Sequence, residues 1–271
     1  MPAPEDDRSL LVHAARAAGA LALKDAGEPV DFWEKPDGAG PVTATDLAVN
    51  AVLHETLRSA RPDYGWLSEE TEDDTDRLTR ERVFIVDPID GTRSFIEGGR
   101  TWAHALAVAE RGVVTAAVVF VPRLDKLYSA AAGQGAWLNE VPIRTSQQAA
   151  MEGATMVAAK PNFAPEHWRD GRVPPMERTY RPSLAYRLSL VAEGRFDAMM
   201  VTRPTWEWDI AAGDLINREA GARISDRAAQ PLIFNNPTPL LNGVVAANPT
   251  LHSAIAGSLV YGLPSGKGQD C

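Results

Sequence analysis

The sequence predicts an α+β protein with an antiparallel sheet in its N-terminal half and a smaller α/β C-terminal half. Apolar residues recur at helical spacing before residue 62, and from residue 103 the pattern changes to strands divided by turns. From about residue 145, strand-like and helix-like segments alternate, which is typical of an α/β arrangement. The predicted domains are therefore residues 1–144 and 145–271.

Two helices are predicted to open the N-terminal half. Residues 8–26 carry apolar side chains at helical spacing among good helix formers. The second helix is expected to begin at Thr45, a residue type that caps helices, and to stop at Pro62. Strand-like segments separated by turn residues follow at 103–111, 112–122 and 126–132. Strands joined by such short turns form an antiparallel sheet.

The C-terminal half is predicted to alternate between strands and helices after a proline-rich loop that ends at Pro182. The predicted strands are 153–159 and 196–201, and the predicted helices are 183–194 and 209–221. An uncharged tract from Ala228 to Gly266 is long enough for a membrane span, but its prolines and asparagines predict short strands and turns. No membrane partner is therefore expected, and residues 265–271 are expected to form a weakly ordered tail.

The composition narrows the class of partner. A net charge of -9 argues against a surface for a nucleic acid polymer, and an acidic protein that handles phosphates would need metal ions. Cys271 is the only cysteine, so an intramolecular disulfide is impossible and a reducing compartment is expected. The acidic N-terminus does not have the pattern of a secretory signal. These observations predict a cytoplasmic protein with a small-molecule partner.

Carboxylates gather around the segment VFIVDPIDGTRSF, residues 83–95. Asp87 and Asp90 follow an apolar, strand-like run, and Pro88 stiffens the backbone between them. One interpretation is structural: Asp90 caps a short helix that begins at Gly91. Further acidic residues lie at the ends of other predicted elements, namely Asp46, Glu69, Glu70 and Asp209. Capping alone accounts poorly for so many carboxylates.

A metal site is the second interpretation of this segment. Mg²⁺ takes oxygen ligands, and two neighbouring ions need a carboxylate that bridges them. The rigid turn would direct Asp87, Asp90 and the Ile89 carbonyl to one point. Gly91 and Thr92 then offer backbone N–H groups at a helix start, where a phosphate group is attracted. The segment therefore predicts a metal and phosphate site.

This segment, with SEET before it and WEWDIAAGDLINREAG after it, resembles the signature of the inositol monophosphatase superfamily of Mg²⁺-dependent, lithium-sensitive phosphatases. The matching motifs run from Lys35 to Gly221. The resemblance implies a layered α-β-α-β-α sandwich with the site between its two halves, and a homodimer. For two or three Mg²⁺ ions, the ligands it implies are Glu69, Asp87, the Ile89 carbonyl, Asp90 and Asp209.

The resemblance also implies catalytic roles. Thr92 and Asp46 match the family's pair that activates a water, and Glu69 helps to position that water. The water then attacks phosphorus in line, without a covalent phosphoenzyme. Lys35 matches a lysine near the metal site, while the amides of Gly91 and Thr92 bind phosphoryl oxygens.

The second half of the sequence bears on the substrate. A glutamate that holds inositol hydroxyls in inositol monophosphatases is Thr202 here, and RPTWEWD resembles the matching segment of bacterial 3'(2'),5'-bisphosphate nucleotidases. A nucleotide such as adenosine 3',5'-bisphosphate is the predicted substrate, while inositol 1-phosphate and histidinol phosphate stay open. A cation-stabilised regulatory protein of the same fold is the alternative without catalysis, and the complete carboxylate set argues against it.

Two tryptophans, two arginines and one histidine near these motifs are not expected to bind metal. Trp206 is expected to contact substrate and Trp208 to pack. Arg181 and Arg187 either bind a second phosphate or pair with surface carboxylates, and the pairing is favoured. His104 lies on an apolar strand and is expected to be a core residue.

Overall fold

The computed structural model describes residues 6–35 and 40–262. The predicted tail and Cys271 lie outside the described residues. Within the described ranges, no helix combines the length and the apolar character that crossing a membrane requires.

The described part of the chain forms both helices and strands. The helices are α1 (Asp7–Ala22), α2 (Ala44–Ala60), α3 (Thr92–Ile96), α4 (Leu184–Ala192), α5 (Glu207–Glu219) and α6 (Pro249–Ser258). The strands are β1 (Phe32–Glu34), β2 (Pro41–Thr43), β3 (Gly65–Ser68), β4 (Arg82–Asp90), β5 (Ala103–Glu110), β6 (Val113–Val121), β7 (Lys126–Ala131), β8 (Ala136–Leu138), β9 (Val141–Pro142), β10 (Thr155–Val157), β11 (Glu177–Thr179), β12 (Ala198–Val201), β13 (Thr205–Trp206), β14 (Arg223–Ser225), β15 (Leu240–Leu241) and β16 (Val244–Ala247).

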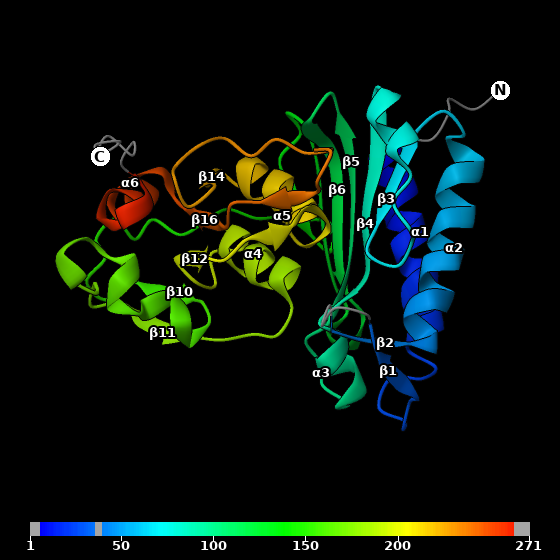
Figure 1. Cartoon of the computed structure of the whole chain (residues 1–271), viewed down its shortest axis with the longest axis horizontal. Coiled ribbons are helices and arrows are strands. Elements are labelled where there is room, and N and C mark those ends of the chain that lie inside the picture. The colour runs from blue at the N-terminus through cyan, green and yellow to red at the C-terminus, as the bar shows by residue number, and fades with distance from the viewer. Residues whose placement is uncertain (1–5, 36–39, 263–271) are drawn as a thin grey trace, which may run out of the picture.

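These elements stack in five alternating layers (Figure 1). Helices α1 and α2 cover one face of a seven-stranded sheet, and α4 and α5 lie between that sheet and a five-stranded one. Helix α6 packs on the outer face of the five-stranded sheet. The predicted α-β-α-β-α sandwich is confirmed.

Capping residues fix where the two N-terminal helices begin. Asp6 Oδ1 accepts a hydrogen bond from the Ser9 amide at 2.8 Å, which starts α1. The N-cap of α2 is Thr43, and the prediction of Thr45 in that role is wrong. Thr43 forms a capping box with Asp46, because each side chain accepts a hydrogen bond from the other residue's amide. Thr45 lies inside the first turn.

The seven-stranded sheet runs in the order β3-β4-β5-β6-β7-β8-β9. The pairs from β4 to β9 are antiparallel, which confirms the prediction for β5, β6 and β7. The sequence pattern does not predict β8 and β9, nor the parallel edge strand β3. Successive residues of β4 serve opposite faces. Phe84 and Val86 pack with α1 and α2, and Val83 and Ile85 pack toward α4 and α5.

A glycine lets the two central helices approach each other closely. A Cβ atom at Gly213 of α5 would lie 2.5 Å from Leu188 Cδ1 of α4, which is too short for any real contact. The pairing of these helices therefore depends on the absence of a side chain at this position. It matters for the site because α5 carries Asp209 and the start of α4 meets Asp90.

The five-stranded sheet runs in the order β11-β10-β12-β16-β14. Strand β10 is parallel to β11 and β12, while β16 is antiparallel to its neighbours. The prediction of only strands and turns between Ala228 and Gly266 is wrong, because α6 lies there. Asn248 caps this helix and Pro249 fills its first position, where a missing N–H costs nothing. The division into domains at residue 144 stays a prediction.

Candidate active site

A bulge in β4 turns two aspartates to the same side of the sheet. Asp87 pairs with Ala105 of β5 and Asp90 pairs with Ala103, so three steps along β4 oppose two along β5. Residues three apart on a regular strand would point to opposite faces. The extra residue between them brings Asp87 and Asp90 to the same side.

Asp90 is held by α4 and not by the helix that follows it in sequence. Its Oδ2 accepts hydrogen bonds from Ser183 Oγ and from the Ala185 amide, both at 2.6 Å. Helix α3 begins after Gly91, whose φ of 96° is left-handed and which offers no side-chain cap. The interpretation of Asp90 as the cap of α3 is therefore wrong. The carboxylate instead meets the start of α4, where the helix dipole favours a negative charge.

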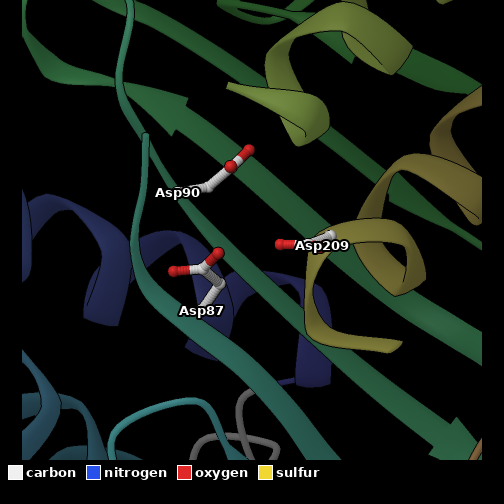
Figure 2. Close-up of side chains that lie close together, drawn as sticks. All are labelled: Asp87, Asp90 and Asp209. Carbon is white, nitrogen blue, oxygen red and sulfur yellow. The ribbon is translucent and has the colours of Figure 1, made fainter. Parts of the chain in front are cut away.

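Asp87, Asp90 and Asp209 come together at one point between the layers (Figure 2). One carboxylate oxygen of each lies within 4.8 Å of the others, and Asp209 comes from the first turn of α5. Both oxygens of Asp87 are buried without a hydrogen-bond partner among the described residues. Burial raises the pKa of Asp87 and of Asp209 well above the ordinary value, and the neighbouring carboxylates raise both further.

This set of oxygen atoms fits a hard divalent cation. A buried carboxylate without a partner is costly, and a bound cation would remove both the missing contact and the repulsion between like charges. The carbonyl oxygen of Ile89 lies between the two aspartates of β4 and accepts a hydrogen bond from Thr92 Oγ1 at 3.0 Å. Carboxylate and carbonyl oxygens are the ligands that Mg²⁺ prefers. The acidic cluster could therefore hold Mg²⁺.

Glu69 and Glu70 share one cation. Lys35 Nζ lies 2.7 Å from Glu69 Oε1 and 2.6 Å from Glu70 Oε1, so the predicted lysine does lie near the acidic residues. Burial raises the pKa of Glu70 to about 7. The nearby charge of Glu69 contributes to the raised pKa of Asp87, although Glu69 lies outside the cluster of three aspartates. The contact with Lys35 involves only Oε1 of Glu69, so Glu69 could act as a metal ligand through Oε2.

Thr92 and Asp46 form the pair that the sequence predicts. Thr92 Oγ1 donates to Asp46 Oδ1 at 3.2 Å. The other oxygen of Asp46 accepts from the Thr43 amide at 2.9 Å and from the Thr43 hydroxyl. Burial raises the pKa of Asp46, and the hydrogen bonds from Thr43 oppose that shift. The capping box of α2 thus also orients the carboxylate that contacts Thr92.

A cavity of about 410 Å³ opens beside α4. Sequence reasoning missed three cationic or polar side chains that line it: His167 and Arg227, which no motif marks, and Arg203, which begins the RPTWEWD segment but received no role. The favoured interpretation of Arg187, pairing with a surface carboxylate, is wrong because this residue is buried, lines the cavity and has no ion pair among the described residues. Arg181 also lacks a carboxylate partner within the described ranges, and its Nη1 donates to the Tyr180 carbonyl at 2.6 Å.

The two tryptophans before Asp209 stack face to face. Their ring centroids lie 4.9 Å apart with an interplanar angle of 11°. Trp208 packs against the core, which confirms its predicted role, while Trp206 is 40% exposed. Trp206 is not among the described residues that line the cavity, so its contact with substrate stays a prediction.

His104 is a core residue, as predicted. Its side chain is fully buried, and its Nδ1 contacts the Pro88 carbonyl inside the bulge of β4. Burial lowers the pKa of His104 to about 4. The ring is therefore neutral at physiological pH and contacts the bulge of β4 from the neighbouring strand β5.

Comparison with known proteins shows which proteins this chain is similar to. A model of the inositol monophosphatase family matches residues 4–261. An inositol-1-monophosphatase from Rhizobium meliloti is 35% identical over 230 residues, covering 80% of this chain and 84% of that protein. The 3'(2'),5'-bisphosphate nucleotidase CysQ from Escherichia coli is 32% identical over 232 residues, covering 84% and 94%. The crystal structure of the extragenic suppressor protein suhB from Bartonella henselae superposes with a TM-score of 0.80 at 28% identity, covering 94% and 98%.

Proposed function

The chain belongs to the inositol monophosphatase family of phosphatases, and from that premise we propose that it hydrolyses the phosphomonoester of a small metabolite at the cluster of Asp87, Asp90 and Asp209. The observation that carries the proposal is Asp87, whose two buried oxygens have no hydrogen-bond partner among the described residues. A structural carboxylate is normally satisfied by hydrogen bonds. An unsatisfied one that faces two other carboxylates is suited to bind metal ions.

The proposed site holds two or three Mg²⁺ ions. Their ligands are the oxygens of Glu69, Asp87, Asp90 and Asp209 with the carbonyl of Ile89. When bound, Mg²⁺ supplies Lewis-acid chemistry: it lowers the pKa of water and stabilises the charge that develops on phosphoryl oxygens.

Side chains around the cluster orient the reactants. Thr92 donates its hydroxyl proton to Asp46 or to the Ile89 carbonyl, and its oxygen can therefore accept a hydrogen bond from the attacking water. Glu69 is proposed to position the same water. Asp46 fixes the Thr92 hydroxyl and can hold a proton, because burial raises its pKa.

The phosphoryl group is proposed to lie next to α3. The amides of Gly91 and Thr92 are assigned to bind its oxygens, and Lys35 supplies a positive charge nearby. Lys35 forms ion pairs with both Glu69 and Glu70, and burial opposes but does not cancel the rise in its pKa that these carboxylates cause. It stays protonated and can stabilise negative charge on the substrate.

The proposed substrate is a 3'(2'),5'-bisphosphate nucleotide. Thr202 supports this choice because it is buried and its hydroxyl donates to Asn162 Oδ1 at 2.9 Å, so no acidic acceptor faces a polyol at that position. Trp206 is proposed to contact the base. Inositol 1-phosphate is the second candidate, and the Rhizobium meliloti relative that carries the name inositol-1-monophosphatase favours it. The homodimer and the cytoplasmic location stay predictions.

Phosphate release from these two substrates tests the proposal. We expect Mg²⁺-dependent turnover that millimolar-range Li⁺ inhibits, with a higher kcat/KM for adenosine 3',5'-bisphosphate than for inositol 1-phosphate. A ratio in favour of inositol 1-phosphate would reject the nucleotide and leave the metal site intact. Full turnover in excess chelator would reject the metal-dependent phosphatase itself.

A further inference from the structure

Glu69 lies in a turn at the edge of the seven-stranded sheet. Strand β3 ends at Ser68, and Glu69 and Glu70 form the turn that follows it. The Glu69 amide donates to the Val86 carbonyl at 3.2 Å, which joins the start of the turn to β4. The position of the Glu69 carboxylate therefore depends on what holds the rest of the turn.

The side chain of Asn50, from α2, holds this turn on both sides of Glu69. Its Oδ1 accepts a hydrogen bond from Ser68 Oγ at 2.8 Å. Its Nδ2 donates to the Glu70 carbonyl at 3.3 Å and to Thr71 Oγ1 at 3.0 Å. An asparagine amide offers one carbonyl oxygen and two N–H donors. Residues 68–71 thus engage the oxygen and both donors of this side chain.

Two further hydrogen bonds order the same turn. The Glu70 amide donates to Ser68 Oγ at 3.3 Å, and the Trp66 indole N–H donates to Thr71 Oγ1 at 3.1 Å. Both acceptors are hydroxyl groups that Asn50 also contacts. The hydrogen bonds of the turn therefore converge on Asn50, and its removal would weaken them together.

Helix α2 carries Asn50 one turn after Asp46. Residues four apart lie on the same face of a helix. Asp46 accepts a hydrogen bond from Thr92 Oγ1, so this face of α2 contacts both the segment after β4 and the turn after β3. Asn50 thereby fixes Glu69 relative to Thr92, and these are the two residues proposed to position the attacking water.

The charge of Glu69 acts on the whole acidic site. Burial raises the pKa of Asp46, of Asp87 and of Asp209, and the neighbouring charge of Glu69 adds to each shift. Coulomb interactions weaken with distance, so Glu69 lies near all three carboxylates although it is outside the cluster. A displacement of the turn would therefore change how Glu69 shares a cation with them.

We propose that Asn50 is a positioning residue: it holds the chain on both sides of Glu69 and thereby sets the affinity of the acidic site for Mg²⁺. The inference rests on the proposed function, because it assigns Glu69 to the metal ions. Asn50 is assigned no contact with metal or substrate, and it acts through Glu69. Replacing Asn50 should therefore change Mg²⁺ affinity before it changes the chemical step.

Calorimetric titration of the metal-free protein with Mg²⁺, without substrate, tests this role. Asn50→Ala should weaken Mg²⁺ binding about 10- to 100-fold, the usual effect of removing a group that orients a metal ligand. Glu55→Ala is the matched control, because it also introduces an alanine in α2 but at an exposed position, where the carboxylate accepts a hydrogen bond from Ser59. Its Mg²⁺ affinity should stay within about twofold of the wild type.

A double-mutant cycle tests whether Asn50 acts through Glu69. In the Glu69→Ala background, Asn50→Ala should change Mg²⁺ affinity by less than about twofold, because the side chain that it positions is gone. An equal loss of affinity in both backgrounds would overturn the proposal. So would an Asn50→Ala protein with a lower free energy of unfolding and unchanged Mg²⁺ affinity, since that result describes a purely structural contact.

Thr71→Val keeps the test valid if Asn50→Ala does not fold. This change removes the hydroxyl that accepts hydrogen bonds from Asn50 and Trp66, while the side chain stays β-branched. It should weaken Mg²⁺ binding in the same direction and by a smaller factor, because Asn50 keeps its contacts with Ser68 and Glu70. Wild-type Mg²⁺ affinity in Thr71→Val would overturn the proposal.

Steady-state kinetics with adenosine 3',5'-bisphosphate separate this inference from the proposed function. Asn50→Ala should raise the Mg²⁺ concentration for half-maximal turnover about 10- to 100-fold and keep kcat at saturating Mg²⁺ within about threefold of the wild type. If neither candidate substrate is hydrolysed but Asn50→Ala weakens Mg²⁺ binding only when Glu69 is present, the proposed function fails and the positioning role stands. Turnover with the Mg²⁺ dependence of the wild type would overturn the positioning role and leave the phosphatase proposal intact.

Discussion

At the scale of single residues, Asp87 combines burial, missing hydrogen bonds and repulsion from its neighbours. Its pKa is raised above the unfolded value, so at neutral pH the ionised group destabilises the metal-free fold. Proteins retain such a cost where function requires it. Asp87 should therefore affect stability and activity in opposite directions.

Asp87→Asn should stabilise the protein in excess chelator by at least about 1 kcal/mol, because the amide removes a charge and can donate to Asp90 or Asp209. The same change should lower Mg²⁺-dependent turnover more than about 100-fold, and more than Glu70→Gln does. Chemical denaturation and phosphate release measure the two effects. Asp63→Asn, at an exposed position, is the control. A destabilised variant with normal turnover would contradict the metal-ligand role.

At the scale of elements, buried polar contacts join segments that are distant in sequence. Arg77, in the 3₁₀ helix Thr75–Thr79, is 2% exposed and donates to Asn235 Oδ1 at 2.6 Å and to the Asn236 carbonyl at 2.9 Å. The amides of Asn235 and Asn236 donate in turn to Glu207 at the start of α5. This network links the segment after Glu69 to the helix turn that carries Asp209.

Arg77→Lys should destabilise the protein by about 1 to 3 kcal/mol, because a lysine cannot reproduce the fork that binds Asp73 and the 235–237 loop. The residue directly after this 3₁₀ helix, Arg80, offers a matched control. Arg80 pairs with Asp76 at the same i,i+4 spacing but is exposed, so Arg80→Lys should change the free energy of unfolding by less than about 0.5 kcal/mol. Equal effects in urea denaturation would show that the buried network contributes nothing beyond a surface pair.

Helix α6 is joined to β14 by a buried histidine. His252 Nε2 lies 2.8 Å from Ser225 Oγ, and burial lowers the pKa of His252 to about 4. The unfolded chain, with a histidine pKa near 6.5, binds this proton first as pH falls. The neutral ring therefore stabilises the fold fully above pH 6.5, and that contribution is lost as pH falls toward 4.

His252→Gln should remove the share of acid destabilisation that belongs to this ring, on the order of 2 to 3 kcal/mol between pH 6.5 and 4. His104, whose pKa is lowered in the same direction, keeps its own share in the variant. Free energies of unfolding at several pH values in this window measure the slope. An unchanged slope in His252→Gln would mean that this ring is not kept neutral by the fold.

At the scale of the whole molecule, the aspartate cluster joins the seven-stranded sheet to helix α5 of the central helical layer. Asp87 and Asp90 come from the seven-stranded sheet, and Asp209 from α5, which packs between the layers. A cation bound to all three would cross-link these layers in the folded state only. Binding to the folded state alone stabilises it by mass action.

Mg²⁺ at 100 times its dissociation constant should therefore raise the free energy of unfolding by about 2.7 kcal/mol. For a chain of this size that corresponds to roughly 5 to 10 °C in Tm. Thermal unfolding with and without Mg²⁺ measures the shift, and Asp87→Asn should abolish most of it. A Tm that does not respond to Mg²⁺ in the wild type would count against a metal site at this cluster.

Local sequence determined most of the secondary structure of this protein and the positions of its acidic motifs. Helical and alternating periodicity reflect which face of each element is buried, so most helices and the antiparallel strands could be predicted from single segments. The acidic motifs could also be predicted from local sequence, because Asp87, Asp90 and Asp209 lie beside strand and helix boundaries that the sequence pattern indicates. The prediction was wrong where two local signals compete. Proline usually interrupts a helix, but Pro249 directly follows the N-cap Asn248 and is the first residue of α6.

Tertiary structure alone decided which distant groups meet. The bulge that aligns Asp87 with Asp90 depends on pairing with β5, and the hydrogen bond from Ser183 to Asp90 joins residues 93 apart in the sequence. The three arginines that line the cavity come from helix α4 and from two loops, and no spacing in the sequence relates them. Periodicity reports only the burial of a segment's own faces, whereas a binding site is made by contacts between segments, which form when the layers pack.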